Sequence, residues 1–231
     1  MYRPSVAALG RALVALAFLG VSSCSTFETE PPRRVIPLAF AGPSSYAPLS
    51  GLQGKEAVLE PGAEDMAVER ISWRRVGILP CFMQVYKRAP ENPDRVAIDK
   101  SEQCEGAKGD ESPIKSVGEF NAPLSPTMRV ITALRGCYPK QGSGKRLAAI
   151  EVEISELRPD GSISAPQTGT EERFGSGFDD CGQLAEWSRC EPGQVANGVR
   201  VHFDKALGSR FIVGLELRCR ALVPAAAAAS G

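Results

Sequence analysis

Two stretches of the chain align with each other without a gap. The stretch "VITALRGCYPKQGSGKRLAAIEVE", which begins at Val130, matches "VANGVRVHFDKALGSRFIVGLELR", which begins at Val195, at an offset of 65 residues. The identical pairs are Val130/Val195, Arg135/Arg200, Lys140/Lys205 and Glu151/Glu216. A repeat constrains a fold because every copy forms the same unit and buries its apolar face against its neighbours. We therefore expect repeated units over about 125–158 and 190–222.

A third copy is suggested upstream, around "EDMAVERISWRRVGI". Met66, Val68 and Ile71 there resemble Met128, Val130 and Leu134 of the first copy, although the match needs a gap. The sequence alone leaves the existence of this third unit open.

The repeated stretches have the period of β-strands. Ile150, Val152 and Ile154 alternate with polar residues, and "RPDG" after them suits the tight turn of a hairpin. The segment 211–220 also alternates, and Asn197-Gly198 is expected to interrupt a strand pair within 195–203. The pattern predicts an all-β fold of repeated antiparallel strand units, stabilised by disulfides, and leaves a β-prism and a β-sandwich open.

The N-terminus has the features of an export signal. Arg3 and Arg11 precede eight apolar residues, Ala12 to Leu19, whereas a membrane-spanning helix needs about 20. The tetrapeptide from Val21 to Cys24 resembles the bacterial lipobox, which implies cleavage of a signal peptide over 1–23 and acylation of Cys24 by diacylglycerol and palmitate-type chains. Several acyl chains give stable anchoring, and Ser25 after the cysteine favours the outer membrane by the same resemblance.

The composition of the mature chain indicates three parts: a tether, a β domain and a C-terminal tail. Prolines and glycines recur up to about Gly62, which favours a lipid-anchored tether over 24–62, although "RVIPLAF" within it could form a first strand. A β domain is expected over 63–223. The final "PAAAAASG", residues 224–231, is low in complexity and is expected to be disordered.

Removing Cys24 from the count leaves an even number of cysteines: Cys81, Cys104, Cys137, Cys181, Cys190 and Cys219. In an exported chain six cysteines indicate up to three disulfides, with about 15 complete pairings possible. A metal site is not expected, because the sequence contains no CxxC and only one histidine, His202.

The second copy resembles the repeats of jacalin-like β-prism lectins and of the vitelline membrane outer layer protein. The carrying motif is "CEPGQVANGVRVHF", followed by "FIVGLELRC". The resemblance implies a bond between Cys190 and Cys219, after which Cys81–Cys104 and Cys137–Cys181 are the simplest remaining pairs. The family's Gly-x-x-x-Asp sugar loop is not carried over, because "LGSRF" lacks the aspartate.

No catalytic constellation is recognisable. GxSxG, Walker and HExxH motifs are absent, so we expect no enzyme activity and no cofactor. His202 alternates with Val201 and Phe203 and is expected to face solvent or a neighbouring strand. With 27 basic and 27 acidic residues, the chain has no positive surplus for nucleic acid.

Aromatic side chains are the candidates for a ligand site, because a ring can stack on a sugar face. The candidates are Trp73, Trp187, Tyr138 and Phe178, and each of them could instead fill the core. Trp187, which stands next to polar residues, is the best single candidate, and Tyr138 is kept beside it. The sequence therefore favours a lipid-anchored outer-membrane protein whose non-catalytic β domain binds polysaccharide or an envelope protein. The alternatives are an assembly component of a surface complex and an unrecognised hydrolase.

Overall fold

All elements in the described part of the chain are β-strands, which confirms the predicted all-β fold. The structure, a computed structural model, describes residues 36–58, 65–76, 79–100, 104, 115–117, 127–140, 146–166, 172–174, 181–206 and 209–225. These residues lie in one compact unit, from Pro32 onward. The predicted signal peptide, Cys24 and the chain after residue 225 lie outside the described residues. Within those residues, no helix could cross a bilayer.

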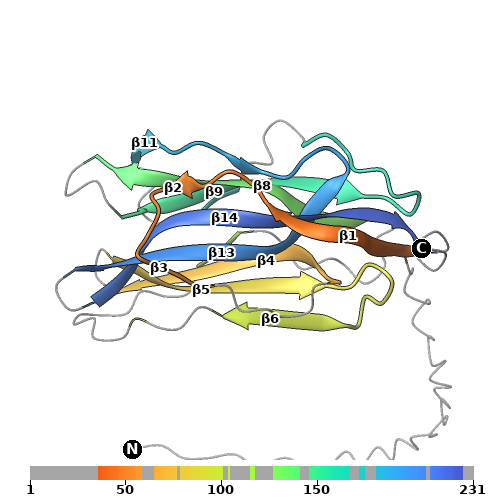
Figure 1. The fold of residues 1–231 in the computed structure, drawn as a ribbon, viewed down its shortest axis with the longest axis horizontal. Helices are drawn as coiled ribbons and strands as arrows, with labels where there is room; N and C mark the ends of the chain where they lie inside the picture. Colours follow the sequence, from red (N-terminus) through yellow and green to blue (C-terminus); the bar gives the residue numbers. More distant parts are fainter. Residues whose placement is uncertain are drawn as a thin grey trace, which may run out of the picture. The chain divides into compact units, whose positions relative to one another are not determined.

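The strands form three antiparallel sheets (Figure 1). Sheet A contains, in order, β1 (Leu38–Tyr46), β14 (Ser209–Pro224), β13 (Gln194–Ala206) and β3 (Glu56–Val58), with β2 (Ser50–Gly51) also paired to β14. Sheet B contains β6 (Val96–Lys100), β5 (Leu79–Arg88), β4 (Ala67–Val76) and β7 (Lys115–Val117). Sheet C contains β10 (Glu172–Phe174), β9 (Ala149–Leu157), β8 (Met128–Pro139) and β11 (Cys181–Leu184), with β12 (Ser188–Arg189) also on β8.

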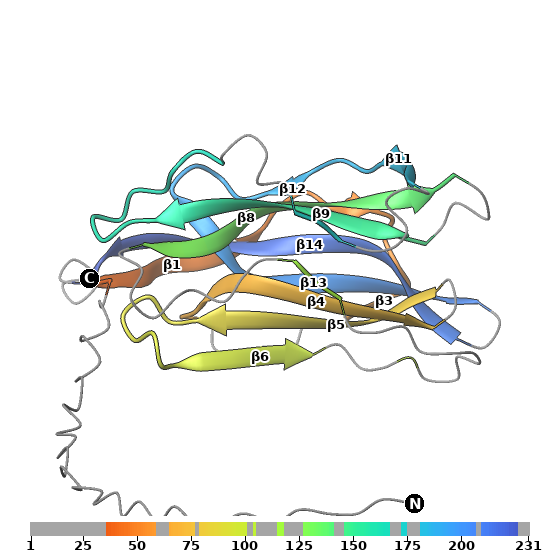
Figure 2. The same ribbon diagram turned by 180° about the vertical axis from the view of Figure 1, so that it is seen from behind.

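The larger of two apolar clusters forms the main core, between the three sheets. Sheet A contributes Phe203 and Leu215, sheet B contributes Ile71, and sheet C contributes Leu134 and Ile150, all at most 1% exposed. Burying one such side chain contributes about 1.5–3 kcal/mol. Sheets on three sides of a single core form a β-prism, whereas a β-sandwich has two sheets. Figure 2 shows the same three layers from behind.

The predicted repeat is present as two strand pairs with the same register. Arg135 of β8 lies opposite Glu151 of β9, and Arg200 of β13 lies opposite Glu216 of β14. Both pairs also contain a β-bulge at the same place, at Thr132 and Asn197. The Asn197-Gly198 step is therefore a bulge within one continuous strand, and the expectation of an interrupted strand pair was wrong.

The β4–β5 pair is a third copy, which the sequence left open. Its bulge lies at Glu69, and two residues later Ile71 enters the core, as Leu134 and Val199 do after the other two bulges. The bulges at Glu69 and Thr132 are 63 residues apart, whereas those at Thr132 and Asn197 are 65 apart. A match at the constant offset of 63 needs no gap; the gap arises because Met66 and Val68 are matched to Met128 and Val130 at an offset of 62.

The three bulge residues are all polar and all buried. Glu69 accepts hydrogen bonds from Arg88, Thr132 bonds Ser155, and Asn197 accepts from Arg218. A bulge leaves one residue outside the regular ladder, and a buried polar side chain needs a hydrogen-bond partner. Each copy supplies that partner locally.

The prediction of a tether over residues 24–62 was wrong in its C-terminal part. Residues 38–58 contribute three strands to sheet A, and Leu38 and Phe40 are buried. The apolar alternation of Ile36, Leu38 and Phe40 lets β1 cover the edge of β14. Pro43 favoured a tether in the sequence, but it lies where the β1–β14 register shifts. A strand tolerates proline at an edge or at such an irregularity.

Candidate functional site

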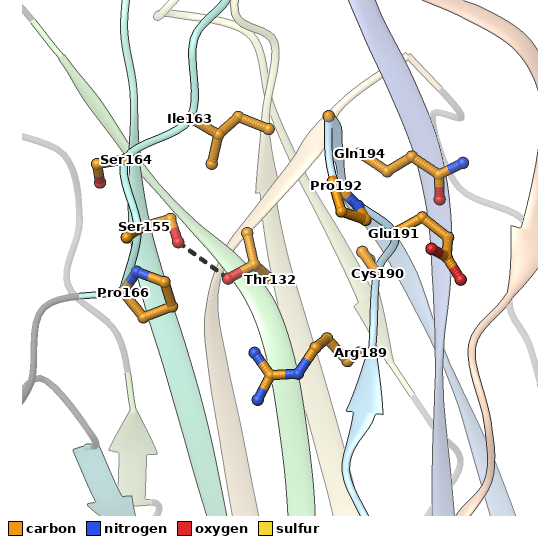
Figure 3. A pocket seen from close by; sticks show the side chains of 12 residues that line it. Thr132, Ser155, Ile163, Ser164, Pro166, Arg189, Cys190, Glu191, Pro192 and Gln194 are labelled. Carbon is orange, nitrogen blue, oxygen red and sulfur yellow. Dashed lines mark hydrogen bonds between the residues drawn. The ribbon is translucent and has the colours of Figure 1, made fainter.

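A pocket of about 410 Å³ opens between sheet C and the turn that leads into β13. One wall is the segment from Ile163 to Pro166, after β9, and the other is the turn from Cys190 to Gly193, between β12 and β13 (Figure 3). Thr132 and Ser155 lie between the walls, and Arg189 and Gln194 complete the lining. Ligand pockets commonly measure about 300–1,000 Å³.

The floor of the pocket is a pair of hydroxyl groups. The Oγ1 of Thr132 and the Oγ of Ser155 lie 3.0 Å apart and share one hydrogen bond, drawn as a dashed line in Figure 3. Thr132 is the bulge residue of β8, so its side chain stands outside the regular alternation of the strand. The pair uses one hydroxyl proton, so the other proton and several lone pairs can bond a ligand.

Backbone contacts and a disulfide hold the turn that forms the second wall. The Cys190 amide donates to the Thr132 carbonyl at 3.0 Å, and Cys190 is bonded to Cys219 of β14. The Leu217 amide donates to the Ser188 hydroxyl at 2.8 Å. Gly193 has φ of +82°, a conformation that favours glycine. The wall is therefore attached to both β8 and β14.

The wall after β9 is held by a hydrogen-bonded extension of the hairpin. The Ser164 amide donates to the Glu156 carbonyl, and the Glu156 amide donates to the Ser164 hydroxyl, both at 2.9 Å. Arg158 and Gly161 form the tight turn between, which confirms the turn predicted from "RPDG".

A cluster of arginines, glutamates and one tryptophan lies beside the pocket. Arg189 forms a bidentate ion pair with Glu153, and this hydrogen bonding raises the pKa of the Arg189 guanidinium. The Trp187 ring contacts two guanidinium groups, that of Arg135 at 4.4 Å and that of Arg189 at 5.3 Å from the ring centre. Trp187 thus adjoins the pocket through Arg189 but does not line it.

The corresponding place in the second copy is also occupied by an ion pair and an aromatic ring. Arg200 bonds Glu216 at 3.2 Å, and its guanidinium carbon lies 3.6 Å from the centre of the Tyr46 ring. His202 is 4% exposed and lies 3.5 Å from Glu216 on the neighbouring strand, one of its two expected positions. The identical Arg and Glu positions of the repeat are therefore cross-strand partners.

Tyr138, the second aromatic candidate, lies away from the pocket. Its ring packs on the core, and its hydroxyl donates to the Val213 carbonyl at 3.5 Å. Burial raises the pKa of the Tyr138 phenol. Trp73 is a core residue, 2% exposed, and Phe178 lies outside the described residues. Ligand binding by Trp187 and Tyr138 stays a prediction.

The three disulfides pair as expected: Cys81–Cys104, Cys137–Cys181 and Cys190–Cys219. Among the described residues, no cluster of three or more histidine, cysteine, aspartate or glutamate side chains could hold a metal ion.

Sequence reasoning missed Thr132, Ser155, Arg189 and Gln194. Thr132 and Gln194 belong to the repeated stretches or border them, but nothing in their spacing indicates a ligand. The pocket depends on a bulge and on two turns that approach each other only in the folded chain.

Comparison with known proteins gives structural similarity only. No family model matches the sequence, and no curated protein matches it. The fold is similar to that of the Calystegia sepium agglutinin (10% identity, 78% of this chain and 99% of that one, TM-score 0.49). It is also similar to wild-type Malaysian banana lectin, with 10% identity over 79% of this chain and 99% of that one, at a TM-score of 0.43. A third similar structure is the V. cholerae biofilm matrix protein Bap1, with 12% identity over 80% of this chain and 26% of that one, at a TM-score of 0.34. At these values the similarities assign neither a family nor a ligand.

Proposed function

We propose that this chain is a lipid-anchored envelope protein whose β domain binds polysaccharide in the pocket around Thr132 and Ser155. The observation that carries the proposal is the mixed lining of the pocket. Hydroxyl, amide and guanidinium groups alternate there with the apolar faces of Ile163, Pro166 and Pro192. A sugar ring has the matching chemistry, with hydroxyls at its edge and C–H groups on its faces.

The charge of the pocket lining indicates which kind of sugar would fit. Arg189 is already paired with Glu153, and the Glu191 carboxylate also belongs to the lining. The rim therefore has no positive surplus, which favours a neutral sugar over an anionic one.

Glycan binding can be tested on the chain from Ser25 to Gly231, which keeps every described strand. We expect a neutral bacterial or host-cell glycan to bind on an array, with the affinity measured by calorimetry. Thr132→Val and Ser155→Ala should each weaken binding about tenfold, because each removes a hydroxyl group from the floor of the pocket. Lys205→Ala, at the far end of β13, is the matched control and should leave the affinity unchanged. Absence of binding to any glycan, or equal affinity in all variants, would contradict the proposal.

The anchor is a separate part of the proposal, supported by the lipobox alone. We expect Cys24→Ala to abolish labelling of the full chain with a radioactive fatty acid and to leave the precursor uncleaved. Ser25→Ala, the adjacent control, should keep both labelling and cleavage. Labelling that persists in Cys24→Ala would refute acylation at this residue.

A further inference from the structure

His202 is a buried histidine without a hydrogen bond. The residue is 4% exposed, and both of its ring nitrogens are buried and have no hydrogen-bond partner among the described residues. Its neighbours in β13, Val201 and Phe203, enter the core, so the imidazole lies on the outer face of sheet A. A side chain on an outer face is exposed unless another part of the chain covers it.

Residues 52–55, which we call the crossing segment, connect β2 to β3 across sheet A (Figure 1). β2 pairs with β14 at Gly214, on the edge away from β13. β3 lies at the opposite edge of the sheet, where Ala57 is the partner of His202. Because the core fills the inner face of the sheet, the crossing segment passes over the outer face.

Two close contacts place the crossing segment at His202. Gly214 is the cross-strand partner of His202, and a Cβ added to it would collide with the Leu52 carbonyl. A Cβ added to Gly54 would collide with the backbone of Phe203, the residue after His202. Since both contacts involve neighbours of His202, the crossing segment covers the imidazole.

The first copy of the repeat has a covalent bond at the equivalent place. His202 corresponds to Cys137, which is bonded to Cys181 of β11. β11 and β3 are equivalent strands, because Leu184 lies opposite Cys137 as Ala57 lies opposite His202. The outer strand of sheet C is therefore fixed by a disulfide, whereas the outer strand of sheet A lies beside a side chain that can be protonated.

A protonated His202 would have incomplete compensation for its charge. The titratable residues of the elements around it are Tyr46 of β1, Lys55 and Glu56 beside and in β3, Arg200, Asp204 and Lys205 of β13, and Glu216 and Arg218 of β14. Glu216 Oε2 lies 3.5 Å from His202 Nε2, but Arg200 already bonds this oxygen at 3.2 Å. A buried charge is costly unless it is paired and hydrogen-bonded, and His202 Nδ1 has no acceptor.

We propose that protonation of His202 releases the crossing segment and β3 from sheet A, so that this edge of the domain opens at acidic pH. The charge of histidine changes between about pH 5 and 8. Water can hydrate both N–H groups of the charged ring only when the crossing segment moves away. β3 pairs with β13 over three residues only, Glu56–Val58, so little pairing opposes the release. The opening is independent of glycan binding in the pocket.

The test measures amide hydrogen exchange of residues 52–58 in the chain from Ser25 to Gly231, at about pH 7.5 and about pH 5.5. After division by the intrinsic exchange rates, we expect exchange to rise about tenfold, since uptake of one proton shifts an equilibrium by at most tenfold per pH unit. Residues 181–184 of β11, which the Cys137–Cys181 bond fixes, are the internal control and should show no such rise.

His202 is the only histidine of the chain, so nuclear magnetic resonance of the imidazole C–H protons reports its protonation directly. The midpoint of this titration should coincide with the midpoint of the rise in exchange. His202→Phe keeps a ring of similar size without a titratable nitrogen and should abolish the rise.

Near-ultraviolet circular dichroism establishes folding of His202→Phe, and the two midpoints in the parent decide the question if this variant misfolds. The proposal is overturned if exchange of residues 52–58 stays constant between the two pH values, or if its midpoint differs from that of the imidazole. It is also overturned if folded His202→Phe keeps the rise, or if β11 opens to the same extent.

Discussion

Lys87 occupies a position whose side chain faces the core in every copy of the repeat. It is fully buried, and its Nζ lies 2.5 Å from Asp99 Oδ2 on the adjacent strand β6. Burial lowers the pKa of the Lys87 ammonium, although the hydrogen bond to Asp99 acts in the opposite direction. A charge in this place is tolerated only because a carboxylate from the sheet edge accompanies it.

Removing this ammonium group should therefore destabilise the fold. We expect Lys87→Ala to lower the free energy of unfolding by about 3–5 kcal/mol, because Asp99 loses its partner in a largely buried place. Lys100→Ala, on exposed β6, should change it by less than about 0.5 kcal/mol. Urea unfolding at neutral pH measures both. A change in Lys87→Ala no larger than in Lys100→Ala would contradict the pairing.

The Lys87 ammonium group also makes the free energy of unfolding depend on pH. The unfolded chain keeps the ordinary pKa of 10.5, above that of the folded state. Between the two values the unfolded state binds more protons, so stability in the parent should rise as pH increases toward 10.5. In Lys87→Ala this contribution should be absent, which urea unfolding across the alkaline range would show.

At the scale of elements, the turn between β12 and β13 links stability to the pocket. The Cys190–Cys219 bond closes a separation of 29 residues and holds the pocket wall against β14. Cys190→Ala with Cys219→Ala should lower the free energy of unfolding by about 3 kcal/mol and also weaken glycan binding. Cys81→Ala with Cys104→Ala should cost stability without affecting the pocket. Urea unfolding and calorimetry separate the two effects, and equal glycan affinity in both double variants would contradict the role of the turn.

The sequence predicted elements well where a pattern is local. Period-two alternation identified the hairpins of the first two copies, and their identical arginine and glutamate positions proved to be cross-strand partners. The third copy was harder to recognise because it has Ser72 and Gln84 at those positions and a different spacing. Of its suggested matches, Ile71 with Leu134 holds, but the bulges align Val68 with Ile131 instead of Val130.

At the scale of the whole domain, the segment 36–58 is structural. Leu38 and Phe40 bury their side chains, and β1 pairs along β14 as far as Pro224. A chain that begins at Gly54 lacks β1 and β2 and therefore exposes apolar side chains, each of which contributes about 1.5–3 kcal/mol to stability when it is buried. We expect this shortened chain to aggregate and to lose cooperative urea unfolding. A chain that begins at Arg34 should unfold as the longer chain does. Cooperative unfolding of the Gly54 chain would show that β1 is dispensable.

The amino-acid sequence by itself determined the strand content, two repeat units, the even set of six cysteines and the resemblance of its N-terminus to a lipoprotein signal. These features follow from periodicity and from residue types at short spacing. Only the tertiary structure decided that three sheets surround the main core, that residues 38–58 form strands of sheet A, and which side chains meet at the pocket. The physical reason is that the fold brings together residues far apart in the chain, such as Thr132 with Cys190 and Ser44 with Asn197. Short-range patterns carry no information about such pairings.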